Sequence, residues 1–282
     1  MDGLYAIEMD GIQSMNHKDS PKVSFLMSIR HCSERLEDCL ESLVFQTYAN
    51  YNIVIVLDNA ERQVHKVVKA YAALYSKILV IENPRPRNLA TSLNYGLNYC
   101  DGDWIARIDA DDVSNPDRLK IQVDFALKNG DSFAVIAARA KGIPWKAHKL
   151  PHYELSSKDF FRSNPIVHPS VMIRKQILKE YRYTESFKFS QDYKLWTRII
   201  RRYRMAIINQ ELIEYNVRKR EPNYVLSQES YFLLANLTFL LKKFFEAIKW
   251  GEKREIVLSL FLNINSSFNL AKNYVRVLLQ RF

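Results

Sequence analysis

The first half of the chain alternates between short apolar runs and longer stretches with helical spacing. The apolar runs, which predict strands, are Val23–Ile29, Ile53–Leu57, Ile78–Ile81 and Trp104–Ile108. The stretches that predict helices between them are Arg35–Gln46, Val64–Tyr75 and Leu89–Tyr99. Alternation at this pitch predicts right-handed βαβ units and a mostly parallel sheet flanked by helices, so the expected fold class is α/β.

The second half of the chain is less regular. Its pattern predicts helices at Pro116–Lys128 and Gln191–Tyr203, and strands at Phe133–Ala137, Val167–Ile173, Met205–Ile208 and Leu212–Val217. Residues 138–151 show no clear period, and from residue 226 the pattern is helical to the end, with a break near residues 250–251. We therefore expect a poorly ordered extension over 1–21, an α/β domain over 22–220 and a helical extension over 221–282.

Composition narrows the class of protein. Apolar residues make up 48% of the 282 residues, which is enough to bury a sizeable core. Only 7 residues are glycine, and neither the GxGxxG nor the GxxxxGK[ST] motif occurs, so dinucleotide binding and P-loop chemistry lose their main support. The three cysteines form no CxxC pair, which argues against a disulfide framework or a zinc site and fits a reducing, cytoplasmic compartment. No apolar run approaches the roughly 18 residues of a spanning helix, and the N-terminus lacks the apolar run of a signal peptide.

The positive net charge of the chain bears on the kind of partner that it binds. The formal net charge is +10, and basic clusters lie in the second half at residues 198–204 and 218–220. A basic balance points to nucleic acid, an anionic membrane surface or a phosphorylated substrate. Because no nucleic-acid-binding motif accompanies the charge, we expect no nucleic-acid partner and favour a membrane surface or a diphosphate.

The strongest chemical signal is an acidic loop directly after the fourth apolar run. Asp109, Asp111 and Asp112 place three carboxylates within four residues, where like charges repel. A divalent cation such as Mg2+ or Mn2+ would offset that repulsion, and it would complete its shell with water and substrate phosphates. The alternative is that an aspartate of this loop caps the helix that follows, and for Asp112 both interpretations stay open.

Other polar residues follow the neighbouring runs. Ser28 and Arg30 lie at the end of the first run, and Asp58 follows the second. Ligands of parallel α/β sheets bind outside the carboxyl ends of the strands, so these residues are candidates for one site with the acidic loop.

Seven segments in this order resemble the family 2 glycosyltransferases, which use nucleotide sugars and have the GT-A fold. The resemblance covers residues 22–220, and each segment alone would be weak. The segments are Val23–Ser28, Glu41–Tyr48, Ile53–Asp58, Leu93–Leu97, Asp109–Asp112 with Pro116–Leu119, Asn164–Met172 and Gln191–Trp196. The resemblance implies a nucleotide-binding half over 22–112 and an acceptor-side half over 113–220.

The resemblance also implies roles for individual residues on the donor side. Asp58 corresponds to the carboxylate that recognises uracil, and Ser28 and Arg30 line the nucleotide pocket. Arg30 is unusual there and would stack on the base or pair with a phosphate. Further donor-binding candidates are Arg87 and Asn88 near the diphosphate, Asp109 near the ribose and the metal, and Asp111 as a direct metal ligand.

On the acceptor side the resemblance gives Asp192 the role of general base in a single inverting displacement. The family usually has Glu-Asp where this chain has Gln191-Asp192, so Gln191 would alter acceptor contacts without removing the base. His168 falls in a motif near the acceptor, where it would touch a phosphate, the metal or the acceptor. The alternative for His168 is a structural histidine bonded to the backbone.

The expected activity is therefore a hexosyl- or N-acetylhexosaminyltransferase that moves one sugar from a UDP-sugar to a glycan or lipid-linked saccharide. The resemblance implies assembly of a bacterial cell-surface polysaccharide such as lipopolysaccharide, O-antigen or capsule. The Gln-x-x-Arg-Trp motif and spanning helices of processive relatives are absent from the sequence, which favours single addition. Two alternatives remain: another nucleotide-sugar enzyme such as a nucleotidyltransferase, and a catalytically silent nucleotide-sugar-binding module.

The C-terminal extension has bulky apolar residues with lysine and arginine at helical spacing. Such helices lie on an anionic membrane, pack on the main domain or contact a second copy of the chain. We expect the helix near Leu233–Phe245 to pack on the main domain. The last helix, with Arg276 and Arg281, would lie nearer the inner face of the cytoplasmic membrane.

Overall fold

The computed structural model describes residues 20–86, 88–144, 150–161, 163–217, 232 and 235–245. Its centre is a nine-stranded sheet in the order β3-β2-β1-β4-β8-β6-β9-β5, with β7 also paired to β9. The strands are β1 (Val23–Ile29), β2 (Tyr51–Leu57), β3 (Ile78–Glu82), β4 (Trp104–Arg107), β5 (Val113–Ser114), β6 (Phe133–Lys141), β7 (His152–Leu155), β8 (Met172–Arg174) and β9 (Arg204–Glu214).

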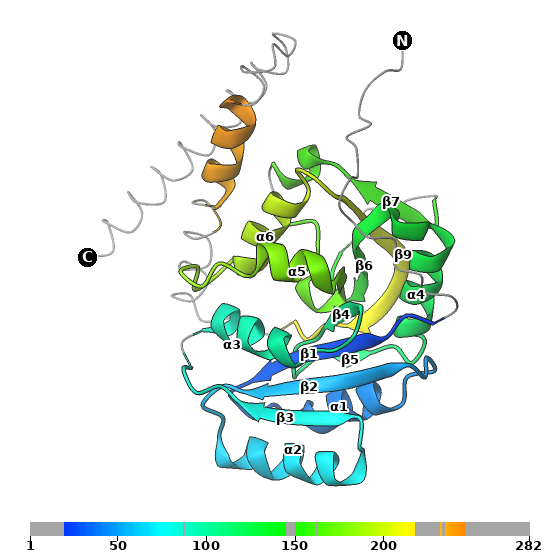
Figure 1. The fold of residues 1–282 in the computed structure, drawn as a ribbon, viewed down its shortest axis with the longest axis vertical. Coiled ribbons are helices and arrows are strands. Elements are labelled where there is room, and N and C mark those ends of the chain that lie inside the picture. The colour runs from blue at the N-terminus through cyan, green and yellow to red at the C-terminus, as the bar shows by residue number, and fades with distance from the viewer. Residues whose placement is uncertain are drawn as a thin grey trace, which may run out of the picture.

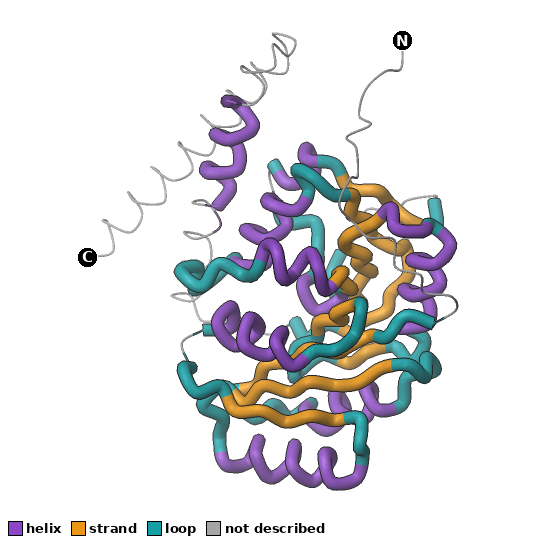
Figure 2. Tube along the Cα trace, in the orientation of Figure 1, coloured by secondary structure: helices purple, strands orange, loops and turns teal. Residues whose placement is uncertain are grey.

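Helices cover both faces of this sheet (Figures 1 and 2). They are α1 (Leu36–Val44), α2 (Arg62–Leu74), α3 (Leu89–Gly96), α4 (Arg118–Lys128), α5 (Lys175–Tyr181) and α6 (Gln191–Ile199). The buried side chains of α1, α2 and α4 share one apolar cluster, whereas those of α3, α5 and α6 share the other. The predicted α/β fold with helices on both faces is confirmed.

Alternation along the central strands explains why the apolar runs are continuous. In β2, Ile53 and Ile55 belong to the cluster with α1 and α2, and Val54 and Val56 belong to the cluster with α3. A strand buried on both faces has no polar side, so it reads as an unbroken apolar run. β1, β2, β3 and β4 pair in parallel, which brings their carboxyl ends to one edge of the sheet.

The second half departs from the sequence predictions in three places. Where one strand was expected at Val167–Ile173, a 3-10 turn at His168–Ser170 precedes β8, because Pro169 fixes the backbone angle and lacks an N–H. The two short strands expected at 205–217 are one strand, β9, which bulges opposite β6 at residues 209–210. β6 continues to Lys141, although residues 138–141 were expected to be irregular.

The sheet runs without interruption through both halves of the expected 22–220 domain, so the division at residue 112 remains a prediction. β5, β7 and α5 were not predicted. Antiparallel pairs join β8 to β4 and to β6, so the sheet is mixed beyond β4. The expected N-terminal extension lies outside the described residues except for residues 20–21.

A helical segment at residues 235–245, shown in orange in Figure 1, packs beside α6. Its Ala235 and Phe239 are buried in the apolar cluster of α6, and the rings of Phe239 and Phe161 lie 6.0 Å apart. Lys194 of α6 donates a hydrogen bond of 2.7 Å to Thr238. The expected packing of this helix on the main domain is confirmed for its described residues, and the expected last helix lies outside them.

Phe239→Ala should therefore lower the free energy of unfolding by about 3 kcal/mol, the usual cost of removing a buried phenylalanine ring. Phe239 is only 3% exposed, whereas Phe245 on the same helix is 65% exposed. Phe245→Ala is the matched control and should change stability by less than about 0.5 kcal/mol. Urea denaturation of the full chain measures both, and equal effects of the two substitutions would contradict the packing.

Candidate active site

The candidate site lies where the parallel strands end. Strands β2, β1 and β4 are neighbours, so the residues that follow them come to the same edge of the sheet. Asp58 follows β2, Arg30 follows β1 and the acidic loop follows β4. The structure thus brings together the strand-end residues that the sequence singled out.

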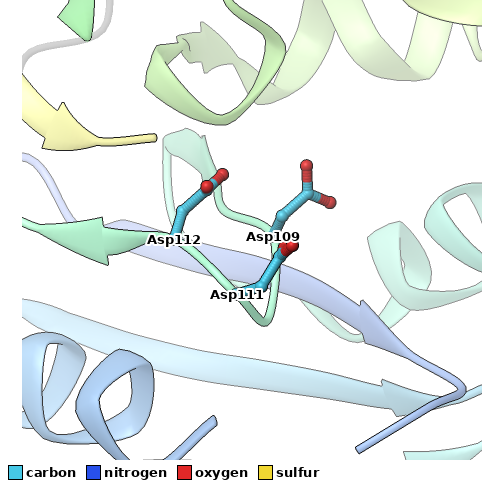
Figure 3. Close-up of side chains that lie close together, drawn as sticks. All are labelled: Asp109, Asp111 and Asp112. Carbon is cyan, nitrogen blue, oxygen red and sulfur yellow. The ribbon is translucent and has the colours of Figure 1, made fainter. Parts of the chain in front are cut away.

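The three aspartates of the loop after β4 form a compact cluster (Figure 3). One carboxylate oxygen from each of Asp109, Asp111 and Asp112 lies within 4.8 Å of those of the other two. Burial and, secondly, the charge of Asp109 raise the pKa of Asp112 to about 7, while the backbone N–H of Asn216 opposes the shift. Oδ2 of Asp112 is buried without a hydrogen-bond partner among the described residues.

The cluster fits a hard divalent cation. Oxygen ligands suit Mg2+ or Mn2+, and a cation would offset the mutual repulsion that helps to raise the pKa of Asp112. Asp112 does not cap the following helix: the residue before α4 is Asp117, and Oδ1 of Asp112 instead accepts the backbone N–H of Asn216 at 2.8 Å. The side chain of Asn216 also donates to Asp111 at 3.3 Å, so the segment after β9 supports the loop.

Arg107, the last residue of β4, contacts this cluster and was not singled out from the sequence. Its side chain is 2% exposed, and Nη2 donates to Oδ1 of Asp109. Nε and Nη1 are buried without a hydrogen-bond partner in the described part of the chain. The available signal was a single arginine in the otherwise apolar run Trp104–Ile108.

The charge of Arg107 acts on Asp192, His168 and Tyr183 as well as on the acidic loop. It opposes the effect of burial on the pKa of Asp192 and adds to the effect of burial that lowers the pKa of His168. Tyr183 has a pKa raised by burial, which Arg107 opposes, and the carboxylates of Asp192 and Asp109 add to the rise. Arg107 therefore couples the acidic loop electrostatically to the residues around Asp192.

Asp58 is almost fully buried and already paired. Arg30 donates from Nη2 to Oδ2 of Asp58 at 2.8 Å and from Nε to the Asp58 carbonyl at 3.1 Å. Asn83, which follows β3 and was also missed, donates to Oδ1 of Asp58 at 3.4 Å and to Ser92 at 3.0 Å. Arg30 is 40% exposed, so one face of the pair reaches solvent. Ser28 lies half-buried near the end of β1.

Of the two residues expected near a diphosphate, the structure describes only Asn88. Asn88 caps α3, since its Oδ1 accepts the N–H of Thr91 at 3.0 Å, and its Nδ2 donates to the carbonyl of Glu185 at 2.8 Å. Both ends of the amide therefore contact the protein, and a diphosphate contact by Asn88 remains a prediction. Arg87 lies outside the described residues.

Asp192 occupies the first turn of α6. Burial raises its pKa, and the backbone N–H of Tyr193, the charge of Arg107 and a hydrogen bond from Asn164 oppose the rise. Gln191 is buried, and its Oε1 has no partner among the described residues.

His168 bonds to a side chain rather than to the backbone. Its Nε2 lies 2.9 Å from the Tyr183 hydroxyl, and its ring packs edge-on against Trp196. Burial and then the charge of Arg107 lower the pKa of His168 well below its usual value, so the imidazole is neutral. A neutral ring supplies no positive charge to a phosphate, but it can still form hydrogen bonds or ligate a metal through a ring nitrogen, so the expected contacts of His168 remain predictions.

Two of the three non-glycine residues with positive φ in the described chain lie within two residues of a candidate carboxylate. Asn59 follows Asp58 with φ 52°, and Ser190 precedes α6 with φ 52°. Such backbone costs on the order of 1 kcal/mol each and is often found at functional sites. The strain is therefore consistent with functional placement of Asp58 and Asp192.

Residues 24–183 match the family described as glycosyl transferase family 2. This chain belongs to that family. It is 32% identical over 216 residues to an uncharacterized glycosyltransferase of Methanocaldococcus jannaschii, covering 73% of this chain and 74% of the relative. This match and the family assignment support a glycosyltransferase enzyme rather than a nucleotidyltransferase.

Two further comparisons concern ligands of the relatives. An Escherichia coli UDP-Gal:alpha-D-GlcNAc-diphosphoundecaprenol beta-1,3-galactosyltransferase is 28% identical over 190 residues, covering 63% of this chain and 67% of the relative. The structure of S. aureus TarS residues 1–349 with UDP-GlcNAc superposes with a TM-score of 0.64 at 17% identity, over 78% of this chain and 66% of that one. The second likeness confirms the GT-A fold of this family 2 glycosyltransferase. Among the described helices, none has the length and apolar character needed to cross a membrane.

Proposed function

We propose that this glycosyltransferase moves one sugar from a UDP-sugar to a hydroxyl of a saccharide or lipid-linked saccharide acceptor, with a divalent cation and inversion at the anomeric carbon. The observation that carries the proposal is the acidic cluster after β4, together with a separate buried carboxylate, Asp192, in the first turn of α6. Metal-assisted departure of a diphosphate needs a group of carboxylates such as the acidic cluster. Deprotonation of an acceptor hydroxyl needs a separate base such as Asp192.

In the proposed reaction the acceptor hydroxyl gives its proton to the Asp192 carboxylate. The acceptor oxygen forms a bond to the anomeric carbon, and the bond from that carbon to the β-phosphate oxygen breaks, so UDP leaves with the electron pair. Asp109 and Asp111 would hold Mn2+ or Mg2+, which supplies positive charge to the departing diphosphate. The ion pair with Arg107 holds the Asp109 carboxylate in place.

The proposed donor is a UDP-sugar because a carboxylate at the position of Asp58 can accept the imide N–H of uracil. Support comes from the E. coli relative, whose name gives UDP-Gal, and from the TarS complex with UDP-GlcNAc. That relative also names a diphosphoundecaprenol-linked acceptor, which supports a lipid-linked saccharide and a place in cell-surface polysaccharide assembly. Such an acceptor would bring the enzyme to a membrane surface.

The test is a panel of UDP-, GDP- and TDP-sugars with mass detection of product on a diphosphoundecaprenol-linked sugar, with and without Mn2+. We expect turnover only with a UDP-sugar and loss of turnover when EDTA removes the metal. Turnover that persists in EDTA would reject the metal, and a preference for GDP- or TDP-sugars would reject the donor assignment.

Asp58→Ala should weaken UDP binding by about 1–3 kcal/mol, because the base would keep a buried donor without an acceptor. The fold should persist, since Arg30 is 40% exposed and can turn to solvent. Asp101→Ala is the control: Asp101 also pairs with a half-exposed cation, Lys22 at 2.6 Å, and it precedes β4 rather than following it. Calorimetry with UDP measures both, and equal affinities for the two variants would show that Asp58 does not contact the base.

A further inference from the structure

A hydrogen bond between Asn164 and Asp192 joins two segments that are 28 residues apart. Nδ2 of Asn164 lies 2.7 Å from Oδ2 of Asp192. The opposite end of the same amide is also fixed, because Oδ1 of Asn164 accepts the backbone N–H of Ile166 at 3.2 Å. With its oxygen used in this way, the amide presents its N–H to the carboxylate, and the reverse orientation would place two oxygens in contact.

We propose that Asn164 is a positioning residue for the general base: it fixes the rotation of the Asp192 carboxylate and stabilises its charged form before the acceptor arrives. The inference rests on the proposed role of Asp192. The carboxylate is then anchored from two directions, by the backbone N–H of Tyr193 at the start of α6 and by the Asn164 amide. A base held in one orientation does not have to be ordered during the reaction.

The choice of a neutral donor matters because of the groups that surround Asp192. The charge of Arg107, at the end of β4, acts on Asp192 and also on His168. The Asp192 carboxylate acts in turn on Tyr183, whose hydroxyl lies 2.9 Å from Nε2 of His168. A cation in direct contact would weaken the carboxylate as a base, whereas burial without any donor would leave it protonated. The Asn164 amide has an intermediate effect, because its N–H stabilises the anion without adding a charge.

Asn164→Leu removes the donor with little change of size, and Asn164→Asp keeps the size and the acceptor for Ile166 while placing a like charge against Asp192. Both changes should raise the pKa of Asp192, because a hydrogen bond that favours the charged form is lost. Asn209→Leu is the matched control: Asn209 is similarly half-buried, and its Nδ2 donates to the carbonyl of Leu150 at 3.1 Å, away from the site.

The first measurement is an NMR titration of the full chain labelled at the aspartate side-chain carboxyl carbon, with the Asp192 signal identified by its loss in Asp192→Asn. We expect Asp192 to titrate at higher pH in both Asn164 variants than in the wild type, and at the wild-type pH in Asn209→Leu. Unchanged titration in both Asn164 variants would overturn the proposal, whatever the state of the activity. Because Asn164→Asp is isosteric, it serves if Asn164→Leu does not fold.

The second measurement is the pH profile of kcat with the UDP-sugar that the wild type turns over. Raising the pKa of the base moves the acid limb to higher pH, so activity should fall on the order of tenfold at the acid end and recover towards the wild-type value as pH rises. UDP affinity should not change. A loss that is the same at every pH, or a loss of UDP affinity, would show a merely structural role. If Asp192→Asn is itself fully active, the proposed base fails, and that result is distinct from a failure of Asn164.

Discussion

Replacing Asp192 with asparagine should reduce turnover by about two to four powers of ten and leave UDP affinity near the wild-type value. The substitution keeps the size of the side chain and an oxygen that can accept the Asn164 hydrogen bond of 2.7 Å. What it removes is the ability to take a proton from the acceptor hydroxyl. Product formation under saturating donor measures kcat, and calorimetry with UDP and Mn2+ measures binding.

The control for this experiment is Asp38→Asn. Asp38 also lies in the first turn of a helix, α1, so the control loses the same favourable interaction of a carboxylate with a helix N-terminus. It should leave turnover unchanged, because Asp38 is exposed and is not part of the candidate site. Loss of UDP binding in Asp192→Asn would place Asp192 on the donor side and contradict the proposed base.

The part of the candidate site at the ends of β2, β1 and β4 was predictable because its residues follow buried strands. Asp58 follows β2 directly and Asp109 follows β4 after one residue, and the parallel pairing of β2, β1 and β4 then brings them to the same edge of the sheet. Whether a residue follows a strand can be read from the local sequence. That the carboxyl ends of these strands lie at one edge then follows from the parallel topology. Their chemical roles came from the family resemblance and not from the pattern.

Contacts between distant segments were not predictable in the same way. The bond from Asn216 to Asp112 spans 104 residues, and nothing near Asn216 in the sequence signals it. The strand β9 was divided in two because the polar pair at residues 209–210 interrupts its apolar pattern, although these residues form the bulge opposite β6. In both cases the deciding interaction comes from a segment far away in the sequence, about which a local pattern carries no information.

The contacts of buried arginines were also not predictable from the sequence. Arg118 belongs to a family motif, and in the structure it is fully buried and donates to the carbonyls of Arg107 and Val171 at 2.9 and 3.1 Å. It thus supports the end of β4 from which the acidic loop departs. The sequence around Arg118 does not predict its contacts with these carbonyls, and the single arginine in the run Trp104–Ile108 does not predict the pairing of Arg107 with Asp109. A buried cation is stable only where the fold supplies its acceptors.

Asp111→Ala should abolish the metal-dependent part of UDP binding and leave the fold intact. Asp111 lies in a partly exposed loop, where it accepts a hydrogen bond from Asn216 at 3.3 Å. Removing one carboxylate from a cluster whose members repel one another costs the apo protein little, whereas a cation loses a direct ligand. Calorimetry of UDP binding in Mn2+ and in EDTA should show a difference for the wild type and none for the variant.

Asp124→Ala is the control, because Asp124 is an exposed aspartate of α4 that pairs only loosely with Lys120, at 3.7 Å. It should keep the full difference between Mn2+ and EDTA. Thermal unfolding of Asp111→Ala without metal should match that of the wild type, since the repulsion among Asp109, Asp111 and Asp112 is relieved rather than increased. A variant that binds UDP in Mn2+ as tightly as the wild type would remove Asp111 from the metal site, and the diphosphate would then depend on the basic residues of the donor half.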